Sequence, residues 1–213
     1  MTIKSETNYW HKTWEGRIRP GETGGVVVNA EKFQVIIKAL WKRLEFIGRE
    51  KFEIGCGTGI HAQYMAALYP CYKTMWTGVD LAESAIAKAK SFGLNAEVAN
   101  IYEYTSDKKY EVFLMLDSLE HFEDHERLAA KIKELAAEQY MIFGNVPMYE
   151  STLHHEGGFE RPMDIHTLRY FLERAGFKSF KHRIFGSFGH PYMLFQGWST
   201  PTNQKRIQIG ELS

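Results

Sequence analysis

One segment constrains the fold of this chain more than any other. A short segment that reads as a buried strand, Lys51–Ile54, leads through Gly55, Gly57 and Gly59 into a helical pattern over Ile60–Leu68. Glycine lets a backbone turn tightly and approach a ligand without a Cβ in the way. A helix that begins directly after such a turn presents free N–H groups and the positive end of its dipole. The segment therefore predicts a strand–turn–helix unit that binds an anionic or nucleoside-like ligand.

Strand-like and helix-like segments alternate through most of the chain. Further strands are predicted over residues 74–79, 97–99, 110–116 and 139–145, and helices over 29–44, 82–92, 123–138 and 164–175. Two final strand-like runs, within 177–186 and 192–198, flank a Gly-His-Pro turn and predict a hairpin. We therefore predict an α/β fold: a doubly wound, mostly parallel seven-stranded sheet with a C-terminal antiparallel hairpin and helices on both faces.

The length of 213 residues suits one domain with a full α/β core. We expect residues 1–45 to form a helical lid or cap, 46–200 the Rossmann-like core and 201–213 a tail. Lys and Arg together number 26, as do Asp and Glu, so the formal net charge is zero. Because nucleic-acid binding relies on an excess of basic side chains, this balance argues against nucleic acid as the main partner and leaves room only for a local basic patch.

Cysteine content and hydropathy indicate the compartment. Cys56, inside the glycine turn, and Cys71 are the only cysteines, so no disulfide framework is implied, as in proteins of a reducing compartment. The first twelve residues lack the apolar run of a signal peptide, and nowhere do eighteen apolar residues run together. We expect a cytoplasmic protein with no membrane partner, present as a monomer or a homodimer.

The residues around the glycines decide between ligand classes. A dinucleotide fingerprint would place a glycine where Ile60 stands, and no phosphate loop of the form G-x-x-x-x-G-K-[ST] occurs. Instead, Glu53 precedes the glycines, and Asp80 follows the second predicted strand, 21 residues after Gly59. Phe52–Gly59, FEIGCGTG, resembles motif I of the class I S-adenosylmethionine (SAM)-dependent methyltransferases, and Asp80 stands where that family has its next acidic residue.

The resemblance spans residues 51–185 and implies SAM as the cofactor and S-adenosyl-L-homocysteine (SAH) as its product. In that family the carboxylate at the position of Asp80 accepts both ribose hydroxyls. Leu119-Glu120-His121 is similar to the family segment that runs beneath the methionine part of the cofactor. The cofactor-binding residues that the resemblance implies are Glu53, Gly55, Cys56, Gly57, Gly59, Asp80, Leu81, Asn100, Ile101, Asp117 and Ser118.

Three of these residues also have a structural interpretation, which the sequence leaves open. Asp80 can cap a helix, Asn100 can start a turn, and Glu53 can bond the amides of the glycine turn. The family commonly has an acidic residue at the position of Asn100, where it meets the adenine amino group. Asn100 departs from that pattern but still offers a side-chain oxygen to an exocyclic amine.

Three histidines are candidates for catalytic residues. His154 and His155 follow the fifth predicted strand, in a region that contributes to the acceptor site of similar methyltransferases. An imidazole there can take a proton from a hydroxyl or amine acceptor, although the pair can equally be a solvated part of a loop. His121 is the third candidate. It has the i, i+4 spacing to His125 of one helix face, but a zinc motif of this kind requires glutamate where Phe122 stands, so we expect no metal.

Substrate-binding candidates lie near the N-terminus and after the fifth predicted strand. Tyr9, Trp10 and Trp14 can form a lid over the site, and Arg17 can meet an anionic acceptor group. Tyr149 lies in the predicted acceptor region. Alternatively, the N-terminal aromatic residues only pack a small helix onto the domain.

The sequence therefore predicts a methyltransferase that moves a methyl group from SAM to a small-molecule acceptor by in-line displacement. Neutral charge, an aromatic N-terminal region and the lack of a recognisable nucleic-acid module favour this hypothesis. A methyltransferase that acts on RNA or protein is the second hypothesis, and a SAM-binding protein without catalysis is the third. A NAD-dependent enzyme is disfavoured by Ile60.

Overall fold

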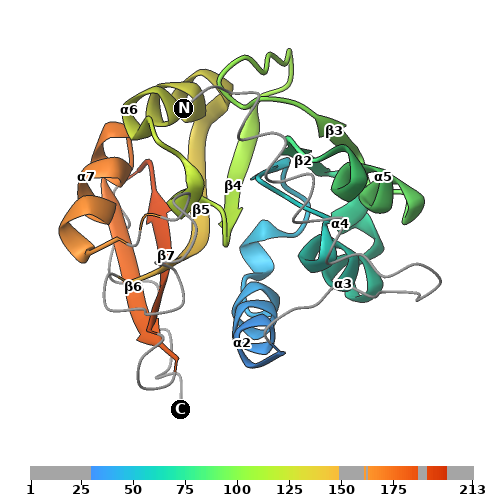
Figure 1. Cartoon of the computed structure of the whole chain (residues 1–213), viewed down its shortest axis with the longest axis horizontal. Coiled ribbons are helices and arrows are strands. Elements are labelled where there is room, and N and C mark those ends of the chain that lie inside the picture. The colour runs from blue at the N-terminus through green and yellow to red at the C-terminus, as the bar shows by residue number, and fades with distance from the viewer. Residues whose placement is uncertain (1–29, 149–160, 162, 187–190, 201–213) are drawn as a thin grey trace.

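The computed structural model describes residues 30–148, 161, 163–186 and 191–200. Its core is a seven-stranded sheet with the strand order β3-β2-β1-β4-β5-β7-β6 (Figure 1). Strands β1 to β5 run parallel, while β7 pairs antiparallel with both β5 and β6. The predicted fold class is confirmed. The strands are β1 (Lys51–Ile54), β2 (Trp76–Asp80), β3 (Ala96–Val98), β4 (Tyr110–Leu116), β5 (Ala136–Pro147), β6 (Ser179–Phe185) and β7 (Tyr192–Trp198).

Helices cover both faces of this sheet. Side chains of β4 alternate between the faces, so Phe113 and Met115 enter one hydrophobic cluster, and Leu114 enters the other. The first cluster is completed by α6 and α7, and the second by α2, α3, α4 and α5. The helices are α2 (Ala30–Trp41), α3 (Ile60–Leu68), α4 (Pro70–Thr74), α5 (Glu83–Ser91), α6 (His125–Leu135) and α7 (Ile165–Arg174), with short 3-10 helices η1 (Leu44–Phe46) and η2 (Leu119–His121).

The strand order reverses between β1 and β4. From β1 the chain builds outward through β2 and β3, and then returns to place β4 on the other side of β1. In sheets of this kind, ligands bind outside the carboxyl ends of the strands at the reversal. Helix α2 lies at this edge, between the tip of β4 and α3, in the lower half of Figure 1. The fold therefore places the candidate site beneath α2.

Two local predictions were wrong. Residues 70–74 form the short helix α4, with Pro70 at its first turn, so β2 begins at Trp76 instead of Thr74. The predicted helix over 123–138 ends at Leu135, and the next residues already belong to β5. Ala136 pairs with Tyr110 at the start of β4, so strand pairing overrides the helix propensity of the Ala-Ala-Glu sequence there.

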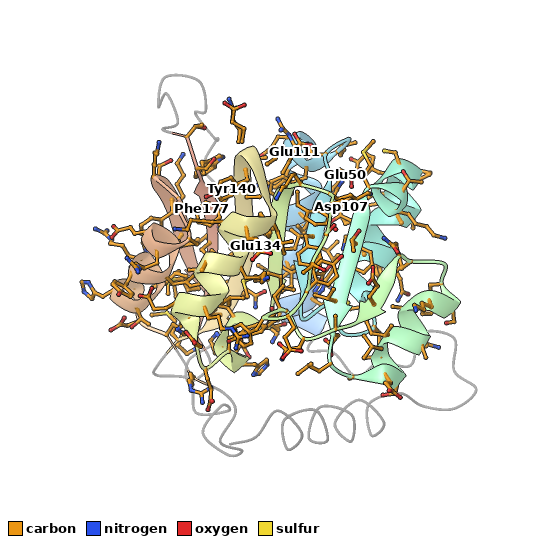
Figure 2. The ribbon with its side chains drawn as sticks, turned by 90° about the horizontal axis from the view of Figure 1, so that it is seen from above. Glu50, Asp107, Glu111, Glu134, Tyr140 and Phe177 are labelled. Atoms are coloured by element: carbon orange, nitrogen blue, oxygen red, sulfur yellow. The ribbon has the colours of Figure 1, made fainter. Side chains whose placement is uncertain are left out.

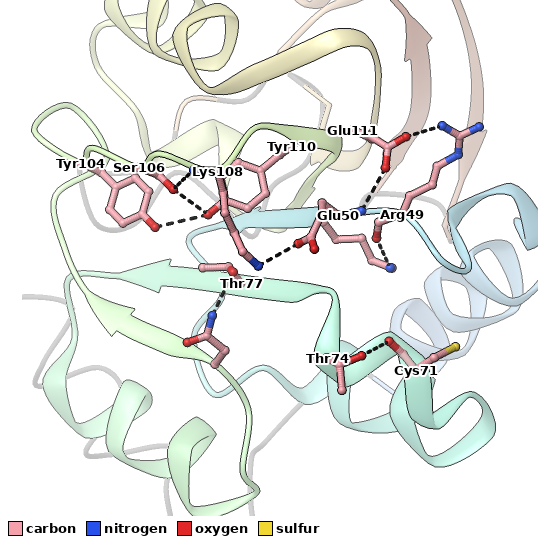
Figure 3. A network of polar contacts seen from close by, with 12 residues as sticks. Arg49, Glu50, Cys71, Thr74, Thr77, Tyr104, Ser106, Lys108, Tyr110 and Glu111 are labelled. Atoms are coloured by element: carbon pink, nitrogen blue, oxygen red, sulfur yellow. Dashed lines mark hydrogen bonds and ion pairs between the residues drawn. The ribbon is translucent and has the colours of Figure 1, made fainter.

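A charged network occupies the opposite edge of the sheet, at the amino ends of β1 and β4 (Figures 2 and 3). Arg49 pairs with Glu111 at 2.8 Å, and Lys108 pairs with Glu50 at 3.1 Å. These partly exposed pairs tie the segment before β1 to β4. They lie at the end of the strands away from the ligand crevice, so we assign them a structural role.

Candidate functional site

The glycine turn after β1 has a backbone that only glycine adopts without strain. Gly55, Gly57 and Gly59 have φ values of 70°, 53° and 65°, all in the left-handed region. A Cβ on Gly55 would lie 2.7 Å from Cβ of Ser118, and a Cβ on Gly59 would lie 2.6 Å from Cδ1 of Leu94. A side chain at either of these two positions would therefore clash with its neighbours.

The buried carboxyl of Glu53 lies beneath this turn. The indole Nε1 of Trp76 donates a hydrogen bond of 2.8 Å to its Oε2. Burial raises the pKa of Glu53 to about 8, more than the hydrogen bond from Trp76 lowers it. At neutral pH the side chain is therefore mainly protonated, and it bonds Trp76 rather than an amide of the turn. Its role toward the cofactor stays a prediction.

We expect Glu53→Gln to weaken the dependence of stability on pH. The folded chain holds the Glu53 proton up to about pH 8, whereas the ordinary pKa is 4.5. The contribution of this group to the free energy of unfolding is therefore lost as pH rises through that window, by at most about 1.4 kcal/mol per pH unit. Urea unfolding between about pH 5.5 and 8 measures the difference, because glutamine keeps the bond from Trp76 but does not titrate. The exposed Glu138→Gln is the control, and a slope unchanged in Glu53→Gln would contradict the assignment.

Asp80 joins the glycine turn to the start of α5. Its Oδ2 accepts the N–H of Gly57 at 2.8 Å, and its Oδ1 accepts the N–H of Ala82 at 2.9 Å. Burial raises the pKa of Asp80, and the backbone N–H groups oppose that rise. The N-cap of α5 is Ala82, so the interpretation of Asp80 as the cap of this helix is wrong. The carboxylate keeps lone pairs beyond these two bonds, as its predicted ribose contact requires.

The end of β3 lies beside Asp80. The N–H of Ala99 donates to the carbonyl of Asp80 at 3.0 Å, which brings Asn100 and Ile101 next to Asp80 and Leu81. Asn100 starts a turn, because its Oδ1 accepts the N–H of Tyr102 at 3.1 Å. Its structural interpretation is thus confirmed, while its contact with adenine stays a prediction.

The end of β4 is tied to the ends of both neighbouring strands. The Ser118 hydroxyl donates to the carbonyl of Ile54 at 2.7 Å. Nδ2 of Asn145, in β5, donates to Oδ1 of Asp117 at 2.6 Å, and the N–H of Asp117 donates to Oδ1 of Asn145 at 3.3 Å. Asp117 has a φ of 53° and is the only non-glycine with positive φ among the described residues. The structure therefore brings Ser118 against Gly55 of the glycine turn, with Asp117 next to it in the chain, and their contact with the cofactor stays a prediction.

Helix α2 reaches this site with two neighbouring side chains. Lys32 Nζ lies 2.8 Å from Oδ1 of Asp117 and 4.4 Å from the centre of the Tyr192 ring, in β7. The Phe33 ring stacks on His61 at a centroid distance of 5.2 Å. Burial lowers the pKa of His61 to about 4, so its imidazole is neutral at pH 7.

These contacts were missed in the sequence. Asn145 carried a usable signal, because it is the polar last residue of a strand predicted over 139–145, at the carboxyl end where ligands bind. Lys32, Phe33, His61 and Tyr192 carried none, since charged and aromatic residues are common on helix surfaces and in strands.

The predicted catalytic and substrate residues are only partly described. His121 ends η2, and its N–H donates to the carbonyl of Ser118 at 3.1 Å. His125 begins α6, and Phe122 between the two histidines is extended, so their i, i+4 spacing does not place them on one helix. The other candidates lie outside the described residues: Tyr9, Trp10, Trp14, Arg17, Tyr149, His154 and His155.

The described residues contain neither a metal-binding cluster nor a membrane-spanning helix. No group of three or more His, Cys, Asp and Glu side chains in this part of the chain is arranged to hold a metal ion. No helix within the described ranges has the length and apolar character to cross a membrane.

The turn fits a nucleoside-bearing cofactor. Its three left-handed glycines keep the backbone free of Cβ atoms on a loop that leads into the N-terminus of α3. Within the described part of the chain, the buried Thr58 hydroxyl of this loop has no hydrogen-bond partner, so a polar ligand atom would satisfy it. Fold and site together define a Rossmann-like protein with a ligand loop at the first βα turn.

Comparison with known proteins gives the family. A sequence model of the Methyltransferase domain matches residues 31–183, which is most of the chain. No curated protein matches the chain. The chain therefore belongs to the Methyltransferase domain family and is a class I SAM-dependent methyltransferase. Its cofactor is SAM, as the resemblance in the sequence implied.

Solved structures share this fold. Magnesium protoporphyrin IX methyltransferase (ChlM) from Synechocystis PCC 6803 with bound SAH has a TM-score of 0.70 at 16% identity, over 93% of this chain and 100% of that one. N-methyltransferase NodS from Bradyrhizobium japonicum WM9 with SAH has a TM-score of 0.67 at 13% identity, over 90% and 98%. A possible histamine N-methyltransferase from Thermotoga maritima has a TM-score of 0.64 at 16% identity, over 93% and 96%.

Proposed function

We propose that this methyltransferase acts on a small molecule. The observation that carries the proposal is the position of α2 across the carboxyl edge of the sheet (Figure 1). Lys32 contacts Asp117 at the end of β4, while the adjacent Phe33 contacts His61 in α3, so the helix reaches both sides of the strand reversal. A helix over this edge favours an acceptor that is enclosed beneath it over a macromolecule that must present a broad surface.

Charge and similarity support the same proposal. The formal net charge is zero, which gives no general attraction for nucleic acid. Two of the similar structures carry names that specify small acceptors, a magnesium porphyrin and histamine, and this chain covers 100% and 96% of their lengths. These two acceptors are known only for the two neighbouring proteins. For this chain they support only the proposal that the acceptor is a small molecule.

The residues of the glycine turn and of the β2 and β3 ends hold the cofactor in this proposal. Gly55, Gly57 and Gly59 admit it close to the backbone, Asp80 accepts its ribose hydroxyls, and Asn100 and Ile101 border its adenine. SAM supplies an activated methyl group on a sulfonium sulfur, so the protein provides orientation and electrostatics instead of a nucleophile.

A proton must leave an acceptor that reacts through an O–H or N–H group. His121, His154 and His155 are the proposed proton acceptors, because a neutral imidazole nitrogen can take a proton from such a group. His61 is not proposed for this role. Its pKa of about 4 makes it a weak base at pH 7.

Transfer of a labelled methyl group from SAM tests the acceptor class. The full chain is incubated with SAM labelled in its methyl group, in separate reactions with small amines, carboxylic acids, phenols, RNA and unfolded protein. We expect label in at least one small-molecule product, and background label in RNA and protein. Label in RNA or protein alone would contradict the proposal. The Asp80→Ala chain, which we expect to bind SAM weakly, is the control for enzyme-dependent transfer.

A further inference from the structure

Glu120 is a buried acidic residue at the carboxyl edge of the sheet. It lies in η2, the short helix that follows β4, and it is 1% exposed. Its carboxylate interacts electrostatically with the Lys32 ammonium and with the Tyr192 phenol. Enclosing a carboxylate is costly unless opposite charge or hydrogen-bond donors surround it. A buried acid at the edge where ligands bind is therefore a candidate for ligand recognition.

Glu120 connects the cofactor side of the site with the segment that follows β5. Ser118, two residues before it, packs against the position of Gly55. In the other direction, the carbonyl of Glu120 accepts the N–H of Arg161 at 2.8 Å. The nearby Met163 donates its N–H to the last carbonyl of β5 at 3.0 Å. Arg161 and Met163 therefore hold the chain, where it returns from its predicted acceptor region, against η2 and β5.

Two stacked aromatic rings lie at the same edge of the sheet. Phe185 ends β6 and Tyr192 begins β7, and their ring centroids are 5.6 Å apart at an interplanar angle of 23°. Tyr192 pairs with Pro147, the last residue of β5, so the rings flank the carboxyl end of that strand. The Lys32 ammonium lies 4.4 Å from the centre of the Tyr192 ring, so this ring already faces a cation. Phe185 is half-buried, which leaves part of its ring open to a flat apolar group.

Lys32 is paired with Asp117 more strongly than with Glu120. Its Nζ lies 2.8 Å from Oδ1 of Asp117. The pKa of Lys32 is raised because burial, which lowers it, is outweighed by the charge and hydrogen bond of Asp117, with smaller contributions from other groups that include Glu120. His61 adds no positive charge at pH 7, since burial lowers its pKa to about 4. Glu120 therefore adds a carboxylate to this edge beyond the ion pair.

We propose that Glu120 binds the amino group of an arylalkyl amine, which the enzyme methylates on nitrogen. The proposal rests on the small-molecule function proposed above and names its substrate class. The carboxylate attracts an ammonium ion and accepts its N–H groups, and it repels an acceptor that carries a carboxylate of its own. The rings of Phe185 and Tyr192 offer an apolar surface to the aromatic part of the acceptor.

Methylation of such an acceptor requires its nitrogen in the uncharged form. The bound ammonium ion gives one proton to an imidazole, and His121, the residue after Glu120, is one of the proton acceptors proposed above. The nitrogen lone pair then forms a bond to the methyl carbon, while the carbon–sulfur bond of SAM breaks and its electron pair stays on sulfur. The products are SAH and an N-methylammonium ion. Glu120 stays ionised and takes no part in bond formation.

Two probes of opposite charge test this assignment. Phenethylamine and 3-phenylpropanoate share a phenyl ring on a short alkyl chain, and they end in an ammonium and a carboxylate. Each is titrated by calorimetry into the SAH-saturated unmodified chain, Glu120→Gln, Glu120→Asp and the control Glu173→Gln, which changes an exposed glutamate of α7. In the unmodified chain and in the control, phenethylamine should bind at least about 10-fold more tightly than 3-phenylpropanoate.

Removal of the charge should act on the amine alone. We expect Glu120→Gln to weaken phenethylamine binding about 10-fold to 100-fold and to leave SAH affinity within about twofold. Glu120→Asp keeps the charge and should bind phenethylamine more tightly than Glu120→Gln does. With SAM labelled in its methyl group, the unmodified chain should form N-methylphenethylamine. Circular dichroism identifies any variant that has lost its fold.

The amine assignment and the small-molecule function fail in different ways. Equal affinity of the unmodified chain for both probes, tighter binding of 3-phenylpropanoate, or no binding of either would overturn the amine assignment without any variant. An unchanged phenethylamine affinity in a folded Glu120→Gln chain, or an equal loss of SAH affinity, would overturn the role of Glu120. Methyl label in phenols or carboxylic acids but not in amines would overturn the amine class and leave the small-molecule function standing. Label in RNA or protein alone would contradict that function.

Discussion

Asp80→Ala should weaken SAH binding by about 1–3 kcal/mol, or roughly 5-fold to 150-fold. The carboxylate has two roles that alanine cannot replace. It is the proposed acceptor for the ribose hydroxyls, and it accepts the N–H of Gly57, which fixes the middle of the glycine turn. The N–H of Ala82 also loses its partner. Calorimetric titration with SAH measures the change.

Asp107→Ala is the matched control for this substitution. Asp107 is an exposed aspartate near the amino-end edge of the sheet, away from the carboxyl ends of the strands (Figure 2). We expect SAH affinity to stay within about twofold when it is removed, because a long-range charge effect is screened at ordinary ionic strength. Equal SAH affinity in Asp80→Ala and the unmodified chain would show that Asp80 does not hold the ribose.

Gly59→Ala should destabilise the fold and abolish tight SAH binding. Alanine in the left-handed region costs about 1–2 kcal/mol. At this position the new Cβ would also lie 2.6 Å from Cδ1 of Leu94, and overpacking of this kind costs a further 1–3 kcal/mol or so. Relief of the contact moves the end of the glycine turn and the start of α3. Urea unfolding measures the loss of stability, and calorimetry measures the loss of SAH binding.

Gly48→Ala is the control that separates the conformational cost of alanine from the cost of the clash at Gly59. Gly48 has a φ of 78°, similar to that of Gly59, but a Cβ there would meet no atom within 4 Å. We therefore expect it to lose only the conformational 1–2 kcal/mol or so and to bind SAH normally. If both glycine variants lose the same stability and bind SAH equally well, the close packing of the glycine turn does not matter for the site.

Much of the sheet was predictable from the sequence because its central strands are buried on both faces. The clearest of them, β4, ends in the continuous apolar run 112–116, and the glycines mark where β1 ends. The predicted bounds of β1, α3 and β4 match the structure: Lys51–Ile54, Ile60–Leu68 and Tyr110–Leu116. The start of β5 was missed because Ala-Ala-Glu favours a helix locally, and only its pairing with Tyr110 makes it a strand.

The strand ends on the cofactor side of the site can be predicted from the sequence, whereas the contact between Lys32 and Tyr192 cannot. The cofactor side follows from the ends of parallel strands: Asp80 ends β2, Asp117 directly follows β4, and Asn100 lies two residues after β3. The meeting of Lys32 and Tyr192 depends instead on tertiary structure. It requires α2 to pack across the sheet edge and β7 to insert between β5 and β6. No local pattern encodes either event.

The central claim is that SAM binds over the glycine turn between the carboxyl ends of β1 and β4. The most direct measurement is a calorimetric titration of the full chain with SAH, with NAD⁺ as the competing nucleotide. The structure predicts saturable binding of one SAH per chain and no displacement of SAH by NAD⁺, because Ile60 stands where a dinucleotide loop has glycine. Absence of SAH binding by the folded chain, or displacement of SAH by NAD⁺, would contradict the claim.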